Sequence, residues 1–174
     1  MTVEYPDLSD YLAVASAVTG TEPDVALGTM NIDLADSALH APAGSWGGED
    51  FYPDFIDKAA VLLVRLAKNH PLLDGNKRAA WVTLRHFIEM NGWTWRTYPG
   101  VDEADGAVLA VASSEWDEER TAGLAPSTSR RSVDHCRVGD PQPLFRDSPR
   151  CHWGSLVSTA QKRSPLLDAR RTHR

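Results

Sequence analysis

The chain has 174 residues, of which 42% are hydrophobic, and a formal net charge of −6, so its length suffices for one domain with a hydrophobic core. No apolar run approaches the roughly 18 to 20 residues that cross a bilayer, and the first residues lack the basic and apolar regions of a signal peptide. With only Cys136 and Cys151, a disulfide framework typical of small secreted domains is excluded. We therefore expect a cytoplasmic protein with no membrane partner.

Acidic and basic residues are distributed unevenly along the chain. Residues 1–124 carry 20 Asp and Glu against 8 Lys and Arg, whereas residues 125–174 carry 4 against 10. The acidic part argues against a nucleic-acid-binding domain, which usually has a clustered basic face. The basic tail would touch nucleic acid only weakly and without sequence preference, so no specific nucleic-acid partner is expected.

The first 42 residues predict three helices. Ser9 is expected to cap the first, and Gly20 to end it, since glycine adopts the left-handed C-terminal conformation at little cost. A short helix containing Val25 and Leu27 should follow. The third helix should start at Asn31 or Asp33 and stop at Pro42, and it is expected to direct its apolar residues inward: Ile32, Leu34, Ala35, Ala38 and Leu39.

The stretch 40–50 contains Pro42, Gly44, Gly47 and Gly48 around an exposed Trp46. This composition predicts a mobile loop or a short hairpin. Loops of this kind often cover active sites.

Two central helices are predicted next. Residues 53–68 are apolar on nearly all sides, which is typical of a buried helix, and Pro71 prevents its smooth continuation. A second helix should run from Gly75 to Asn91. Residues 93–95 should be extended, and 102–116 should form a further helix. The pattern predicts an all-helical domain.

Beyond about residue 123 the periodicity ends, and residues 125–131 (APSTSRR) are small, polar and basic. This predicts a domain over 1–124 followed by a disordered tail over 125–174. The abrupt change motivates the hypothesis that residues after about Arg120 are a frame-shifted or unselected extension, which reading the alternative frames of the coding DNA would test. The pairs His135, Cys136 and Cys151, His152 lack the usual spacing of zinc ligands, so no zinc site is predicted.

The stretch from Asn69 to Arg78 brings a titratable base, a carboxylate, a glycine and two cations into one short turn. Because Gly75 and Asn76 open a helix, their unpaired N–H groups and the helix dipole can hold a phosphate. Lys77 and Arg78 add positive charge and donors.

Asp74 is a suitable oxygen ligand for Mg²⁺, which commonly shares phosphate oxygens with one or two carboxylates. His70 can accept the proton of an attacking hydroxyl in phosphoryl or nucleotidyl transfer. Taken singly, a histidine before proline and the sequence Asp-Gly-Asn are ordinary turn features. Together they favour a site for a nucleoside triphosphate.

This stretch, from His70 through Leu72 and Asp74 to Arg78, resembles the motif of the Fic/Doc (Fido) family, His-x-Phe-x-Asp/Glu-Gly-Asn-x-Arg between two central helices, and the resemblance covers roughly residues 5–120. It implies an all-α Fido-type helical bundle with a short flap near residues 43–52 that docks the target. It also implies ATP and Mg²⁺, with His70 as general base and Asp74 as the metal ligand. The residues around the nucleotide phosphates would be Gly75, Asn76, Lys77 and Arg78.

The residue at position 77 distinguishes two branches of that family. Members with glycine there typically transfer AMP to a hydroxyl, whereas Doc toxins carry lysine and phosphorylate elongation factor Tu. Lys77 thus resembles the Doc branch, as does Trp81, which replaces a second arginine of many AMP-transferring members. Leu72 departs from the usual Phe and should alter packing only, and Gly75 stands where the Doc toxin has alanine.

The family's inhibitory helix, Ser/Thr-x-x-x-Glu-Gly/Asn, is not evident, because Ser45 and Glu49 have that spacing but lie in the glycine-rich loop. Inhibition would then come from a separate antitoxin. The resemblance implies a Doc-like toxin of a toxin-antitoxin system that transfers phosphate from ATP to a hydroxyl of a protein target, elongation factor Tu. The alternatives are AMP transfer to a protein hydroxyl and an inactive antitoxin-binding module.

Overall fold

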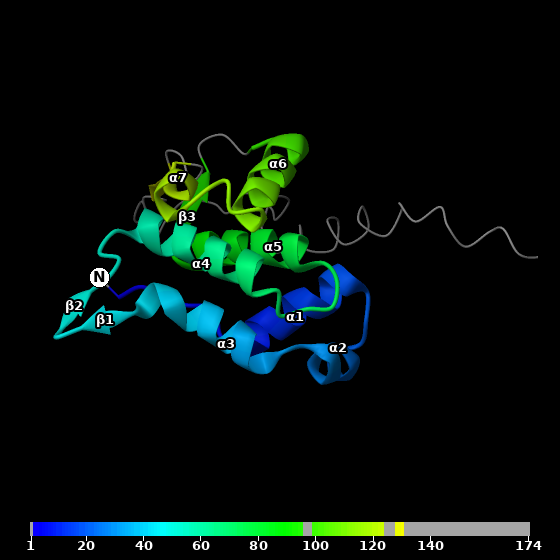
Figure 1. Cartoon of the computed structure of the whole chain (residues 1–174). Helices are drawn as coiled ribbons and strands as arrows, with labels where there is room; N and C mark the ends of the chain where they lie inside the picture. The colour runs from blue at the N-terminus through cyan, green and yellow to red at the C-terminus, as the bar shows by residue number, and fades with distance from the viewer. Residues whose placement is uncertain (1, 96–98, 124–127, 131–174) are drawn as a thin grey trace, which may run out of the picture. The chain divides into compact units, whose positions relative to one another are not determined.

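The computed structural model describes residues 2–95, 99–123 and 128–130, and seven helices account for most of them (Figure 1). The helices are α1 (Leu8–Thr19), α2 (Pro23–Thr29), α3 (Ile32–His40), α4 (Phe55–Asn69), α5 (Asn76–Met90), α6 (Val101–Ala112) and α7 (Glu118–Ala122). One 3₁₀ turn, η1 (Ala41–Ala43), and four short strands complete the described part: β1 (Ser45–Trp46), β2 (Glu49–Asp50), β3 (Trp93–Trp95) and β4 (Thr128–Arg130). The prediction of an all-α fold is confirmed.

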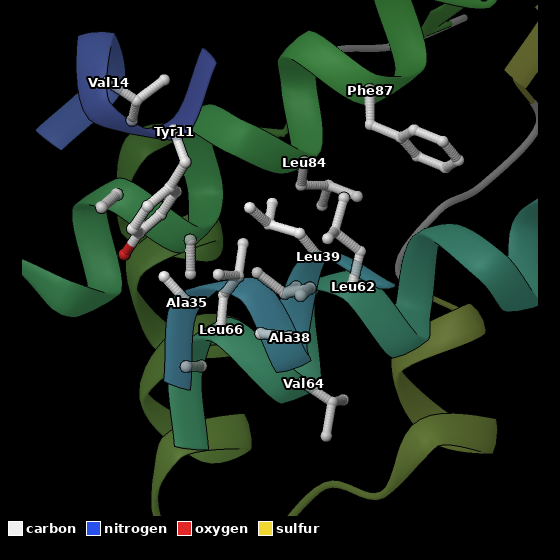
Figure 2. Close-up of a cluster of buried hydrophobic side chains, with 14 of the residues drawn as sticks. Tyr11, Val14, Ala35, Ala38, Leu39, Leu62, Val64, Leu66, Leu84 and Phe87 are labelled. Carbon is white, nitrogen blue, oxygen red and sulfur yellow. The ribbon is translucent and has the colours of Figure 1, made fainter. Parts of the chain in front are cut away.

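Helix α4 lies at the centre of the fold and contacts α3, α5, α6 and α7. Nine of its fifteen residues are buried, which confirms the prediction of a buried central helix. Its burial is the main source of stabilisation here, since each fully buried aliphatic side chain contributes roughly 1.5 to 3 kcal/mol. Figure 2 shows how α1, α3, α4 and α5 share this core through Tyr11, Leu39, Leu62, Leu66, Leu84 and Phe87.

A row of stacked rings joins the amino-terminal segment to the central helices and β3. The ring of Phe55 lies 5.0 Å from that of Phe87 and 4.9 Å from that of Trp93, and Tyr5 lies 5.8 Å from Phe87. Offset stacking of this kind adds about 0.5 to 1.5 kcal/mol per pair beyond burial. Trp93 is therefore a packing residue.

The cap of α1 differs from the prediction. Asp7, not Ser9, is the N-cap, and its carboxylate accepts hydrogen bonds from the backbone N–H groups of Ser9 and Asp10. The Ser9 hydroxyl donates to the same carboxylate, and this bond, with that from the Asp10 N–H, lowers the pKa of Asp7. Asp10 in turn closes a capping box. Gly20 ends the helix in the left-handed region, as predicted.

Helices α2 and α3 form as predicted, and Asn31 caps α3 by accepting from the Leu34 N–H. The prediction that Ile32 and Leu34 point inward is wrong, because these residues are 43% and 38% exposed. They lie in the first turn of α3, whereas the buried face is formed further along by Ala35, Ala38 and Leu39.

The loop before α4 is a hairpin in which Ser45 pairs with Asp50 and Trp46 with Glu49. Gly47 and Gly48 both have positive φ, as a tight two-residue hairpin turn requires. The hairpin is held by Lys58 of α4, whose side chain is only 3% exposed. The Lys58 ammonium donates to the Asp50 carboxylate at 2.8 Å and to the Pro42 carbonyl at 3.2 Å, so it ties both stems to α4.

The carboxyl-terminal elements differ from the prediction in three places. Helix α6 ends at Ala112 rather than near Trp116, and α7, which Asp117 caps, was not predicted. Strand β4 pairs antiparallel with β3, although residues 128–130 lie beyond the domain boundary expected at residue 124. The tail residues His135, Cys136, Cys151 and His152 lie outside the described residues.

Within the described ranges, no helix is both long and apolar enough to cross a membrane.

Replacing Asp50 by alanine should remove the carboxylate from the buried Lys58 ammonium and leave it with the Pro42 carbonyl and Tyr5 as partners. Because a hydrogen bond to a charged group contributes about 1.5 to 3 kcal/mol, we expect Asp50→Ala to lower the free energy of unfolding in urea by a similar amount. Glu49→Ala, a change in the same strand, should stay within about 0.5 kcal/mol of the wild type. Equal effects of the two changes would contradict the role given to Lys58.

Candidate active site

The turn between α4 and α5 carries the residues singled out in the sequence. His70 follows the last residue of α4 and adopts left-handed backbone angles, φ 49° and ψ 56°. This conformation is unfavourable for a residue with a Cβ atom and reverses the chain direction at the helix end. The His70 side chain is exposed, whereas the next residue, Pro71, is buried. The turn thus places the imidazole at the surface, while the next residue is packed in the interior.

Asn76 fixes the shape of the turn through its side chain. Its Oδ1 accepts from the Leu72 N–H at 2.8 Å, and its Nδ2 donates to the Leu72 carbonyl at 2.7 Å. Leu72 is 8% exposed and belongs to the hydrophobic core. Leu72 is therefore a packing residue of the turn. The side-chain amide of Asn76 is thus hydrogen-bonded within the turn. Of the groups of Asn76, this leaves the backbone N–H for the predicted binding of a phosphate.

Gly75 is the N-cap of α5 and has a φ of 81°. A Cβ atom at this position would lie 2.9 Å from Cγ1 of Val18, at the end of α1. Glycine is therefore favoured here by both the backbone conformation and the close approach of α1. No side chain caps the first turn of α5, so this fifteen-residue helix presents unpaired N–H groups at the surface.

The charged residues of the motif surround this helix end. Asp74 is exposed, and its Oδ1 accepts from the Gly75 N–H at 2.7 Å, while its Oδ2 lies 3.8 Å from Nη2 of Arg78. Lys77 and Arg78 are both exposed. The structure therefore brings His70, Asp74, Lys77 and Arg78 to the same end of α5.

Two hydrogen bonds join this turn to the start of α3. The Asn69 side chain donates to the Leu34 carbonyl at 3.0 Å, and the Asn31 N–H donates to the Pro71 carbonyl at 2.8 Å. Neither contact was predicted. An asparagine beside a motif histidine is the only signal in the sequence that could have indicated one of them.

The hairpin β1–β2 is remote from this turn. Lys58, which holds the hairpin stems, precedes His70 by twelve positions on one helix, a separation of about 18 Å at 1.5 Å per residue. The tip at Gly47 and Gly48 is two to three residues from Asp50, so it reaches at most about 10 Å from its anchor. The hairpin and the turn thus lie at opposite ends of α4 (Figure 1).

Ser45 and Glu49 lie in β1 and β2, which confirms that they do not form an inhibitory helix.

The described residues contain no group of three or more His, Cys, Asp or Glu side chains that could hold a metal ion. The donor set at the turn fits Mg²⁺ only in combination with other oxygens, because Asp74 is its single carboxylate. Mg²⁺ is commonly held in this way, by one or two carboxylates together with substrate phosphates and water. The exposed carboxylate of Asp74 is accessible for that role.

The fold and the turn define a class of protein: a helical domain with a basic turn at the start of its second central helix. Residues 5–88 match the Fic/DOC family. The chain is also 38% identical over 119 residues to Toxin Doc of Mycolicibacterium smegmatis, an alignment that covers 68% of this chain and 88% of the relative. The chain belongs to the Fic/DOC family.

The need for glycine at position 75 can be tested by substitution. Gly75→Ala should lower the free energy of unfolding by about 1 to 2 kcal/mol, the cost of a left-handed conformation for a residue with a Cβ atom. Gly28→Ala is the matched control, because φ is not positive at Gly28, in α2, and nothing lies within 4 Å of an added Cβ. That variant should be unchanged or up to about 1 kcal/mol more stable. Urea titrations of both variants would show the difference, and a neutral Gly75→Ala would contradict it.

Proposed function

We propose that this chain is the toxin of a toxin-antitoxin system and that it transfers the γ-phosphate of ATP to a hydroxyl of elongation factor Tu in a reaction that needs Mg²⁺. The observation that carries the proposal is the uncapped amino-terminal end of α5, with His70, Asp74, Lys77 and Arg78 gathered around it. The 38% sequence identity to a protein named Toxin Doc supports the role of a toxin, and an antitoxin is the partner that this role requires.

The phosphates of ATP would bind at the start of α5. The positive end of the helix dipole and the N–H groups of Gly75 and Asn76 favour an anion there, and Lys77 and Arg78 supply positive charge. In the structure the Asp74 carboxylate lies at the proposed phosphate position, since it contacts both the Gly75 N–H and Arg78. On nucleotide binding a phosphate would replace the carboxylate, which would then be free to bind the metal ion. Bound Mg²⁺ would neutralise phosphate charge.

His70 would act as the general base. It accepts the proton of the target hydroxyl while the hydroxyl oxygen forms a bond to the γ-phosphorus, and the bond between that phosphorus and the bridging oxygen of ADP breaks. The proton then passes to solvent. The imidazole suits this role because it is exposed in the turn that leads into α5.

Lys77 supports phosphate transfer over AMP transfer. The family resemblance associates glycine at this position with AMP transfer and lysine with the Doc branch. The lysine is exposed in the first turn of α5, where a cation opposes the helix dipole unless an anion is bound beside it. Its placement is therefore explained by a phosphate-bearing substrate.

The reaction is tested by incubating the purified chain with elongation factor Tu, Mg²⁺ and ATP and measuring the intact mass of the target. We expect a gain of one phosphate, and a rate about 10²- to 10⁴-fold lower with His70→Ala, as for the loss of a general base. His40→Ala is the control, because His40 is an exposed histidine of α3 whose Nδ1 lies 2.9 Å from the Asp36 carbonyl and 3.3 Å from its carboxylate. A gain of AMP would replace the proposal by the Fic-type reaction, and no gain would refute it for this target.

Nucleotide binding is a separate prediction. Arg78→Ala should weaken ATP binding by about ten- to a hundredfold, as expected for the loss of a charged hydrogen bond worth about 1.5 to 3 kcal/mol. Arg65→Ala removes a cation of similar exposure, 48% against 52%, whose partner is Glu118. Calorimetry should show unchanged ATP affinity for that control. An ATP affinity that does not respond to Arg78→Ala would place the phosphates elsewhere, and a wild-type chain that binds no ATP would favour an inactive antitoxin-binding module.

A further inference from the structure

His70 is held in a conformation that its own backbone disfavours. With φ 49° it is one of two non-glycine residues with positive φ in the described part of the chain. Such a conformation persists only when surrounding contacts impose it. The contacts that impose it at His70 therefore decide where the imidazole stands.

The residues on both sides of His70 are hydrogen-bonded to the first turn of α3. On one side, Nδ2 of Asn69 donates to the Leu34 carbonyl at 3.0 Å. On the other, the Pro71 carbonyl accepts from the Asn31 N–H at 2.8 Å. We call these two bonds the α3 clamp. They fix the backbone immediately before and after His70, while the imidazole itself stays exposed.

The receiving end of the clamp is itself rigid. The Asn31 side chain accepts from the Leu34 N–H at 3.1 Å, so the two residues of α3 that contact the turn are joined to each other. Behind them, Ala35, Ala38 and Leu39 are buried in the core. The clamp thus holds the backbone around His70 against a helix that is itself fixed by packing.

We propose that Asn69 is a positioning residue that acts through His70, and that together with the Asn31 N–H it holds the imidazole in the place where it can accept a proton from the target. This inference rests on the proposed function, in which His70 is the general base. A base must lie within hydrogen-bond reach of the proton that it removes, and a displacement of about 1 Å can cost about a hundredfold in rate. Loss of the clamp should therefore lower kcat more than it changes substrate binding.

Two pairs of variants separate positioning from stability. Asn69→Leu removes the amide at the end of α4. Asn91→Leu makes the same change at the end of α5, where the Asn91 amide donates to the carbonyls of Glu4 and Phe87 at 2.8 Å each. The Asn91 amide also accepts from the Glu4 N–H at 2.9 Å. The control therefore loses three hydrogen bonds where Asn69→Leu loses one, at the opposite end of α5 from the motif.

The second pair tests the Asn31 N–H alone. Asn31→Pro removes this donor, and the native φ of −82° suits proline, as does the extended conformation of Met30. Asn31→Ala keeps the N–H and loses only the side-chain cap of α3, which Asn31→Pro loses as well. The difference between these two variants reports the bond to Pro71.

The measurements are kcat and KM for transfer to elongation factor Tu, thermal unfolding, and the NMR resonances of the His70 ring, assigned with His70→Ala. We expect Asn69→Leu and Asn31→Pro to lower kcat by about ten- to a hundredfold with KM for ATP nearly unchanged, and to shift the His70 ring resonances. Asn91→Leu should keep kcat and these resonances close to the wild type even where it lowers the unfolding temperature. Asn31→Ala, which keeps the N–H donor to Pro71, should lose clearly less kcat than Asn31→Pro.

Unchanged kcat and unchanged His70 resonances in Asn69→Leu and Asn31→Pro would overturn the inference, as would equal losses of kcat in the controls. If Asn69→Leu does not fold, the Asn31 pair decides. A wild-type chain that modifies no target refutes the proposed function instead, and the ring resonances then decide the clamp alone: a shift supports it, and no shift overturns it.

Discussion

The burial of α4 is the constraint on which the rest of the structure depends. Four other helices contact it, so its position is fixed along its length and both of its ends are fixed with it. At its start, the buried ammonium of Lys58 holds the hairpin. Burial alone lowers the pKa of Lys58, but the interactions with Asp50 and Tyr5 outweigh it, and the pKa lies above its ordinary value. The lysine therefore stays charged at neutral pH. At its end, α4 delivers His70 to the surface.

The turn after α4 combines rigidity with exposure. The Asn76 amide and the buried side chain of Leu72 anchor it from within, and α3 anchors it from outside. The groups proposed for chemistry, His70, Asp74 and Lys77, all remain exposed. This division suits a site built for transfer to a large protein, because a macromolecular substrate cannot enter a deep cavity.

Much of this arrangement could be predicted from the sequence. The apolar pattern of 53–68 and the glycines at 20, 47, 48 and 75 indicated the central helix and the turns, because burial and positive φ leave local signals. The contacts between distant segments could not be predicted. Lys58 binds a carboxylate eight positions away, and the bonds of Asn31 and Asn69 to the turn depend on how α3 packs. Each is a tertiary contact that local propensity does not encode.

The separation of the hairpin from the motif has a consequence for how such a chain can diverge. Lys58 contacts the stems of the hairpin and not its tip, so residues inserted between Gly47 and Gly48 would lengthen the hairpin without disturbing α4. Because the motif lies at the other end of that helix, the hairpin can change in length and sequence while residues 70–78 are retained. Within a family built on this plan, the hairpin is the segment expected to vary with the proteins that each member meets, and the turn is the segment expected to stay constant.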